Sequence, residues 1–381
     1  MSLLLGHSPK IFIRKPVLVR ASASRSSSPL QTPPCYIDGA KHCGLDHLEL
    51  RFSYASTDYP KLIKKAPVEL VYNDINDPIT PWLAEQFEEG DMVSDAVVTT
   101  IGSSHGWVAS LMHDVGTLRL HDDLNPVASN SDPKLISLPP LVTLPHCQTQ
   151  IITNVSLSSP SPEEEDCVVA VKFLGPQLSY CRPASQSNSE WFNIKIANPS
   201  FFSSPVMFSK KHNMFRILGS GGQLIASWDL CKDEHTPKFQ ELQYHHIPEP
   251  TEAEREVMDT CLTTEHLVEL QSTGETFLVK CFRQIVDGIA LLQTKGVMVF
   301  RVSPKGNATY TQDIGDVTIF ISKAEAFCVR ASSFPGVSPN HVYILDVMEI
   351  SFFKIADSSI TTLTERIMAP YFFPPQNIEY Y

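Results

Sequence analysis

The residues Gly102-Ser-Ser-His-Gly106 match the G-x-S-x-G pattern, in which a serine on a sharp strand-to-helix turn acts as a nucleophile. Ser104 would be that nucleophile, and the first turn of the helix would help to stabilise the oxyanion. The chain after this motif instead has the pattern of strands, at residues 107–112 and 117–120, with a turn between them. We therefore expect a hairpin turn at Ser104, with serine hydrolase activity kept only as an alternative.

Cys35, His42, Cys43 and His47 form a compact group of residues of the types that bind zinc. Zinc takes four such donors in tetrahedral geometry, usually with two or more residues between paired ligands. His42 and Cys43 are adjacent, so their side chains do not readily turn toward the same ion. We interpret the group as two ordinary histidines and two free thiols. We expect no metal and no other cofactor, since neither a Rossmann fingerprint nor a P-loop occurs.

Three further polar runs are interpreted as surface features. The pair His245-His246 is typical of the exposed end of a strand, and Gly219-Ser-Gly-Gly222 is typical of a hairpin turn. The acidic run at residues 163–166 follows a stretch rich in Ser and Pro and precedes a strand-like run, which predicts a solvated loop. An acidic docking surface is the alternative. We thus expect no catalytic, cofactor-binding or metal-binding residues.

The first 37 residues contain five basic side chains and no acidic one, because the first carboxylate is Asp38. A basic, acid-free, serine-rich segment with scattered apolar residues is typical of an organellar transit peptide. We predict that residues 1–28 are a disordered transit peptide, with the mitochondrion favoured over the chloroplast. A tail without a targeting role is the alternative interpretation. The residues that would carry the targeting signal are Lys10, Arg14, Lys15, Arg20 and Arg25.

Beyond residue 37 the chain is strongly acidic. The whole sequence has 42 acidic and 30 basic residues, a formal net charge of -12, so the chain after the five leading bases carries -17. Such a chain has no general attraction for a phosphate backbone or an anionic membrane, so we expect no nucleic-acid partner. No window of 18 uncharged apolar residues occurs, so we expect no membrane span. Nine scattered cysteines without a C-x-x-C pair are interpreted as reduced thiols.

Short runs rich in β-branched and aromatic residues dominate from residue 97 onward, separated by turn residues. Pairs of runs recur on the scale of a four-stranded propeller blade, about 40 to 50 residues. We predict an all-β domain over residues 87–381, a β-propeller of six or seven blades with a few short helices. A large β-sandwich or two smaller all-β domains are the alternatives. The expected strands lie at residues 97–101, 107–112, 117–120, 135–138, 168–173, 178–181, 191–196, 214–218, 224–228, 277–282, 297–302, 317–321, 342–345 and 350–355.

Two segments are predicted to be helical and one to be extended. Thr251-Glu-Ala-Glu254 is a capping box that predicts a helix to about residue 261, and serines that could act as an N-cap predict another over residues 358–366. Residues 29–86 contain repeated X-Pro pairs, which keep the chain extended. This last segment is predicted to be an N-terminal strap, or alternatively to contribute a closing strand.

Several groups of residues, in this order along the chain, together resemble the landmarks of one plant family. It is the domain-of-unknown-function 295 (DUF295) family, also described as the KIB-type β-propeller family, and it occurs in many plant F-box proteins. The resemblance spans residues 81–378 and implies a β-propeller. It is carried by Gly102-Ser-Ser-His-Gly-Trp107, Leu124-Asn-Pro126, Leu138-Pro-Pro140, Gly315-Asp-Val-Thr-Ile-Phe320, Phe334-Pro-Gly336, His341-Val-Tyr-Ile-Leu-Asp346, Phe352-Phe-Lys-Ile-Ala-Asp357 and the Pro-rich residues 369–375.

Many members of that family carry an F-box, a helical module that docks the ubiquitin-ligase adaptor Skp. This chain has no Leu-Pro-x-x-Leu opening in residues 35–86, so it resembles the organellar branch that lacks the F-box. We therefore expect a non-enzymatic, organelle-targeted scaffold that binds a protein partner of unknown identity and no Skp-type adaptor. A cytosolic or nuclear F-box-like substrate adaptor is the alternative from the same class of interaction proteins.

Overall fold

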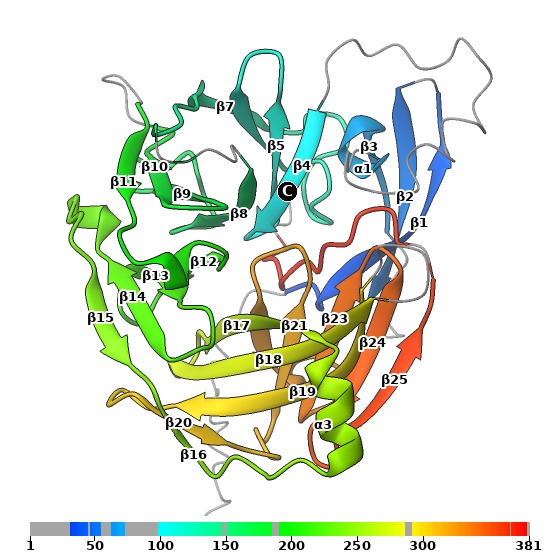
Figure 1. The fold of residues 1–381 in the computed structure, drawn as a ribbon. Coiled ribbons are helices and arrows are strands. Elements are labelled where there is room, and N and C mark those ends of the chain that lie inside the picture. The colour runs from blue at the N-terminus through cyan, green and yellow to red at the C-terminus, as the bar shows by residue number, and fades with distance from the viewer. Residues whose placement is uncertain are drawn as a thin grey trace, which may run out of the picture.

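Six β-sheets stand around one central axis in the computed structural model, each running from the centre of the molecule to its rim (Figure 1). The structure describes residues 31–44, 46–54, 62–72, 98–145, 147, 151–184, 190–285, 292–365 and 367–378. The predicted all-β propeller is therefore confirmed. Of the two predicted blade numbers, six and seven, six is correct.

We number the blades along the chain. Blade 1 contains β1 (Cys35–His42), β2 (His47–Tyr54) and β3 (Ile63–Pro67); blade 2 contains β4 (Val98–Ser104), β5 (Trp107–Met112), β6 (Thr117–His121) and β7 (Leu135–Pro140). Blade 3 contains β8 (Ile152–Leu157), β9 (Val169–Phe173), β10 (Gln177–Cys181) and β11 (Phe192–Lys195). Blade 4 contains β12 (Val206–Ser209), β13 (Met214–Leu218), β14 (Leu224–Trp228) and β15 (Lys238–Glu241).

The last two blades are five-stranded, and each includes one parallel pair of strands. Blade 5 has the order β16 (Gln243–His245), β20 (Asn307–Tyr310), β19 (Leu292–Val302), β18 (Glu275–Ile285) and β17 (Leu262–Leu270), with β16 parallel to β20. Blade 6 has the order β22 (Phe327–Arg330), β21 (Val317–Ile321), β23 (His341–Asp346), β24 (Glu349–Lys354) and β25 (Ser359–Leu363), with β21 parallel to β23. The helices are α1 (Glu69–Tyr72) and α3 (Glu252–Asp259), with 3-10 turns at Pro199–Phe201, Leu230–Lys232 and Ala331–Ser333.

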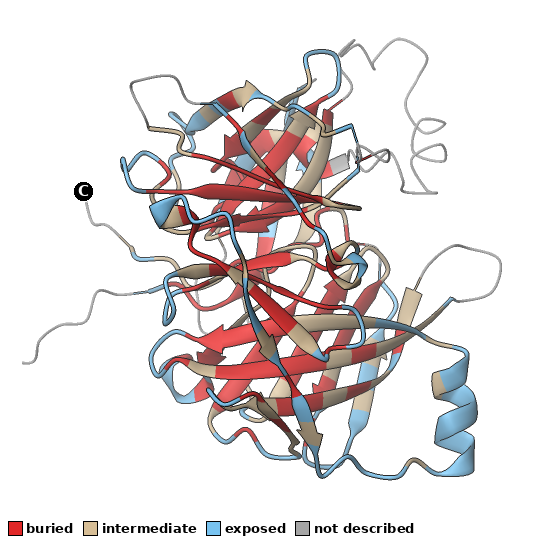
Figure 2. Cartoon of the chain, turned by 60° about the vertical axis from the view of Figure 1, so that its left-hand side comes forward, coloured by how far each residue is buried: buried red, intermediate tan, exposed pale blue. Residues whose placement is uncertain are grey.

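The hydrophobic core lies between neighbouring blades rather than at the axis, which Figure 2 shows as buried strands stacked against one another. Middle strands are consequently buried on both faces: every residue of β9 and of β21 is buried, including Lys172 and Thr318. Alternation of apolar and polar residues is expected only where one face of a sheet meets water. The mainly apolar and β-branched composition of the middle strands is the reason that they were predicted from sequence.

The ring is closed by chain segments from opposite ends of the described residues. Cys35 of β1 exchanges two backbone hydrogen bonds with Phe373, with N–O distances of 2.8 and 3.2 Å, and Thr32 donates to the Gln376 carbonyl at 2.9 Å. The C-terminal segment thereby adds an inner strand-like layer to blade 1. Tyr371 and Phe373 are buried there against Leu50 and the other apolar residues of the blade. The segment predicted to be a strap or closing strand, residues 29–86, thus contains the three strands of blade 1.

All fourteen predicted strand segments have a counterpart among the observed strands, and the helix after Thr251 has the predicted capping box. The predicted helix over residues 358–366 is wrong. Ser358 has a positive φ of 56° in a tight turn, and the Ser359 hydroxyl donates back to Asp357 at 2.6 Å instead of capping a helix. The β-branched residues that follow then pair with β24 as β25.

Two further predictions concern the transit peptide and the absence of a membrane span. Residues 1–28, with Lys10, Arg14, Lys15, Arg20 and Arg25, lie outside the described residues. Among the residues that the structure does describe, no helix has the length and apolar character needed to cross a membrane.

Candidate functional site in the central channel

Two hollows meet at the axis of the ring. The upper hollow, about 420 Å³, lies where the inner strands β4, β8 and β12 begin, and Thr99, Thr153 and Lys323 are among its lining residues. The lower hollow, about 620 Å³, lies where the same strands end, and Ser103, His105 and Arg330 are among its lining residues. Four residues line both hollows and so mark the constriction between them, namely Met207, Ala324, Glu325 and Ala326.

Ser104 lies at this constriction, at the end of β4. Its hydroxyl donates to Glu325 Oε2 at 2.7 Å and accepts from the Leu157 backbone N–H at 3.1 Å. The predicted hairpin is confirmed, because His105 and Gly106 form a tight turn with φ of 53° and 88° that leads directly into β5. No helix follows Ser104, so it lacks the element that would supply oxyanion amides.

Glu325 is the partner that holds Ser104 in place, and it joins three blades. Its Oε1 accepts from the Phe208 N–H of β12 at 2.9 Å, and its own N–H donates to the Ser103 carbonyl at 2.7 Å. Burial raises the pKa of Glu325 to about 7, although hydrogen bonds from Ser104 and Phe208 lower it. A carboxyl group that titrates near neutral pH can exchange a proton there, but its hydrogen bonds are all to the inner strands. Its clearest physical effect is to tie blades 2, 4 and 6 together at the axis.

A second serine lies beside a histidine and an aspartate. The Ser110 hydroxyl is 2.7 Å from His121 Nε2, and His121 Nδ1 is 3.6 Å from Asp123 Oδ2. This order of groups is that of a catalytic triad. Ser110 is fully buried inside blade 2, however, and none of the three residues lines either hollow. A buried polar group needs a hydrogen-bond partner, and Ser110 and His121 supply one to each other inside the sheet.

Two lysines are buried where neighbouring blades meet, and both donate to backbone carbonyls. Lys172 of β9 donates to the carbonyls of Phe173, of Gly175 at 3.0 Å and of Phe202 at 2.9 Å, and burial lowers its pKa to about 8. Lys64 of β3 donates to the carbonyls of Ala128 and, at 3.1 Å, Ser129, and burial lowers its pKa as well. In both lysines, hydrogen bonds to backbone carbonyls replace the hydrogen bonds that water would make to the ammonium group. We therefore assign both lysines a structural role.

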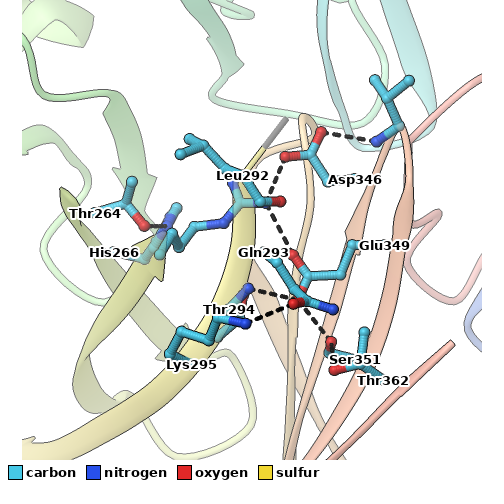
Figure 3. Close-up of polar contacts among 12 residues, drawn as sticks. Thr264, His266, Leu292, Gln293, Thr294, Lys295, Asp346, Glu349, Ser351 and Thr362 are labelled. Carbon is cyan, nitrogen blue, oxygen red and sulfur yellow. Dashed lines mark hydrogen bonds and ion pairs between the residues drawn. The ribbon is translucent and has the colours of Figure 1, made fainter. Parts of the chain in front are cut away.

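A buried ion-pair cluster joins blade 5 to blade 6 (Figure 3). Arg283 Nη2 of β18 lies 2.6 Å from Asp346 Oδ2 and 3.0 Å from Glu349 Oε2. The other oxygen of Glu349 accepts from the Thr294 N–H at 3.0 Å and the Ser351 hydroxyl at 2.6 Å. Burial opposes the charged form of Arg283, but the two carboxylates outweigh it and raise its pKa. Each charge therefore has a partner, as buried charges require.

The structure separates the four residues considered as zinc ligands. Cys35 is buried at the start of β1 beside Phe373, whereas His42, Cys43 and His47 are exposed at the far end of β1 and the start of β2. No group of three or more His, Cys, Asp or Glu side chains that could hold a metal ion is present among the described residues. Cys35 therefore does not lie in one site with the other three residues.

The other polar runs lie where the sequence predicted. His245 and His246 are exposed at the end of β16, and residues 219–222 form the hairpin between β13 and β14. The acidic run lies in the loop between β8 and β9, where Glu163 pairs with Lys134 at 2.6 Å. The predictions of an exposed strand end, a hairpin and a solvated loop are confirmed.

Sequence reasoning did not identify Glu325 or Arg283. Glu325 stands in a short Ser-Lys-Ala-Glu-Ala stretch between two strands, which has the composition of an ordinary exposed loop. For Arg283, the sequence offers one signal: Arg283 and Glu349 both lie in strand-like segments with apolar neighbours. A charged residue in such a segment is rarely buried without a partner. Which partner it has depends on the packing of blades, and periodicity does not contain that information.

Six sheets around an axial channel, closed by segments from both ends of the described chain, define a closed β-propeller. A sequence model of the KIB1-4 β-propeller family matches residues 87–371. The chain therefore belongs to the KIB1-4 β-propeller family. This match agrees with the resemblance of the sequence to the KIB-type β-propeller family. No curated protein sequence matches the chain.

Several solved structures are similar in overall architecture. One is a protein from Lactobacillus plantarum, at 14% identity and a TM-score of 0.39, covering 88% of this chain and 86% of that one. A second is a putative 6-phosphogluconolactonase from Bacteroides fragilis, at 10% identity and a TM-score of 0.38, covering 91% and 98%. A third, from Bacteroides thetaiotaomicron, has 10% identity and a TM-score of 0.34, covering 88% and 79%. At such scores none of these likenesses bears on what this chain does.

Proposed function

We propose that this protein is a non-enzymatic scaffold of the KIB1-4 β-propeller family that binds another protein through the rim of blade 5. The observation that carries the proposal is helix α3. A helix of eight residues is marginal in water unless it packs against something. Yet α3 buries none of its residues and is fixed at its N-terminus by the capping box of Thr251 and Glu254 (Figure 2).

Exposed apolar side chains continue from α3 onto the start of β17 and the end of β18, the two inner strands of blade 5. Val257 is 44% exposed, Leu262 is 55% exposed and Ile285 is 59% exposed. Leu262 is paired with Arg283, and Gln284 donates to Thr260 at 3.0 Å, so the end of α3 lies beside the strand that carries Ile285. We call Val257, Leu262 and Ile285 the rim patch. Exposed apolar residues that lie together are typical of an interaction site, whereas scattered ones are not.

The charge around the rim patch indicates the chemistry of the partner. Residues 249–259 contain five acidic side chains and a single base, Arg255. An apolar patch beside an acidic helix is complementary to a basic segment with an apolar face. We therefore propose a partner that presents such a basic amphipathic segment.

Matched triple variants test this proposal. In the patch variant, Val257→Ser, Leu262→Ser and Ile285→Ser remove the apolar rim patch. In the control variant, Val115→Ser, Leu135→Ser and Val142→Ser remove three side chains that are 56%, 52% and 58% exposed on and beside blade 2. All six positions are exposed, so both variants should fold. We expect one protein to co-purify with the wild type and the control variant, and to bind the purified patch variant at least tenfold more weakly.

The proposal fails if the patch variant keeps every partner of the wild type, or if the wild type binds no protein. It also fails if the recovered partner binds through a segment that is neither basic nor amphipathic.

We further propose that the protein is imported into the mitochondrion, as a member of the organellar branch of the plant DUF295 family. The support is the basic, acid-free sequence that precedes Asp38. A fusion of residues 1–40 to a fluorescent reporter tests this address. Mitochondrial fluorescence, lost when Arg14, Lys15 and Arg20 are replaced by Gln, is the expected result. Diffuse cytosolic or nuclear fluorescence would favour the F-box-like alternative, and chloroplast fluorescence would correct the organelle.

A further inference from the structure

The lower hollow is larger than the upper one, and it does not contain the rim patch. Its volume of about 620 Å³ is within the range of sites that bind small organic molecules. Hydroxyl and amide side chains contribute much of its wall, with Phe208 and Phe334 also lining it. Such a mixture of apolar wall and convergent polar groups is what a polar small molecule requires.

The lower hollow is lined by two cations and two carboxylates, whereas the protein as a whole has an excess of carboxylates. Its two carboxylates are already engaged: Glu269 accepts from the Ser209 hydroxyl and from the Lys211 N–H at 2.9 Å, and Glu325 is held by the inner strands. Its two permanent cations, Lys210 and Arg330, are exposed in the hollow and form no ion pair with any other described residue. Two cations that form no ion pair with another described residue can donate charge-assisted hydrogen bonds to the oxygens of an anion bound in this hollow.

Ser103 supplies an independent observation. Its side chain is 1% exposed and lines the lower hollow, and its hydroxyl has no hydrogen-bond partner among the described residues. Leaving a buried hydroxyl unsatisfied costs about 1 to 3 kcal/mol, so such groups usually have a partner. His105 lines the same hollow beside Lys210. Burial, helped by the Lys210 charge, lowers its pKa to about 4, so its imidazole is neutral near pH 7 and has a hydrogen-bonding nitrogen.

We propose that the lower hollow is a binding site for a small organic anion, whose charged oxygens pair with Lys210 and Arg330 and accept a hydrogen bond from the Ser103 hydroxyl. Phosphate and carboxylate groups share this chemistry. The ligand would lie at the mouth of the channel, against the segments that close the ring, because Gln31, Gln376 and Asn377 also line the hollow. Its binding would therefore brace the closure of the propeller from inside.

Calorimetric titration with inorganic phosphate, citrate and neutral glucose tests the site at low ionic strength, where exposed charges are least screened. We expect saturable binding of phosphate, citrate or both, and none of glucose. Binding of phosphate alone would identify a phosphate-bearing ligand, and binding of citrate alone a carboxylate-bearing one. Lys210→Gln and Arg330→Gln should each weaken binding at least tenfold. Lys305→Gln, which removes an exposed charge outside the hollow, should leave it unchanged.

Ser103→Ala separates a ligand-binding role from a structural one. Because the hydroxyl has no partner, its removal should leave the melting temperature unchanged or higher, while anion affinity falls at least threefold. The inference is overturned if neither anion binds the wild type saturably. It is also overturned if the Lys210 and Arg330 variants bind like the wild type, or if Lys305→Gln weakens binding as much as they do.

Discussion

At the scale of single residues, the polar groups at the axis serve the packing of the blades. Glu325 is the clearest example, because a carboxyl that accepts from Ser104 on β4 and from Phe208 on β12 links strands far apart in the sequence. Ser104, which a sequence motif alone would assign to catalysis, is used by the same network. The sequence predicted its hairpin correctly, since the strands on either side are local. Its partner 221 residues away was beyond reach of any local pattern.

Replacing Glu325 by Gln should change how stability depends on pH. The folded-state pKa of about 7 lies above the ordinary value of 4.5, so between those values the folded state binds more protons than the unfolded state. Stability from this residue is therefore present at acid pH and falls as the pH rises to 7, by about 3 kcal/mol in total. The Gln variant has no carboxyl group to ionise at this position, so it does not lose this stability. We expect its stability relative to wild type to rise by about that amount between pH 5 and pH 8.

Urea unfolding of both proteins across this pH range measures the difference. His105 and His266, whose pKa values are lowered to about 4 chiefly by burial, give the opposite slope, because they lose stability as pH falls from 6.5 to 4. Both histidines are present in the two proteins, so their effect cancels in the difference. Parallel stability curves would show that Glu325 does not titrate in this range.

At the scale of elements, the strands found from sequence and those missed differ by their composition. Middle strands such as β9 and β21 are mainly apolar and β-branched, and they were predicted. Inner strands such as β8 and β12 were missed, because Thr153 and Asn154 of β8 face the channel and Pro205 precedes β12. The inner strand β4 also borders the hollows, but it was predicted because residues 97–101 are a run of β-branched residues.

The contact between blades 5 and 6 is predicted to depend on paired charges. Arg283→Met leaves Glu349, whose side chain is 1% exposed, without its cation and should cost about 3 to 5 kcal/mol of unfolding free energy. Adding Glu349→Gln removes the unpaired charge while keeping acceptors for Thr294 and Ser351. The loss of unfolding free energy in the double variant should therefore be smaller than the sum of the two single losses by at least about 1 kcal/mol. Additive losses in a double-mutant cycle would mean that the pair is not coupled.

At the scale of the whole molecule, the ring depends on a joint between segments from both ends of the described chain. From sequence alone, residues 29–86 are compatible with either a strap or a closing strand. Closure requires that residues near Cys35 meet residues near Phe373, and no periodicity reports a contact across that separation. Lys210 and Arg330, and the unpartnered hydroxyl of Ser103, likewise meet in one hollow only because the ring brings blades together.

Loss of the joint should open the ring at blade 1. Phe373 is fully buried there, so Phe373→Ala should cost about 3 to 5 kcal/mol, with hydrogen-exchange protection falling first in β1 to β3. Phe239→Ala is a matched control, because that ring is 58% exposed and should contribute less than about 1 kcal/mol. Equal loss of protection in all six blades of Phe373→Ala would contradict a local opening.

The central claim is that a protein partner binds the rim of blade 5. A photo-crosslinking amino acid placed at Val257 of the full chain, expressed in cells of its own organism, measures this contact most directly. The account predicts one discrete protein adduct from position 257, attached through a basic amphipathic segment, and no such adduct from the equally exposed position of Val142. The same adducts from both positions, or none from position 257, would contradict it.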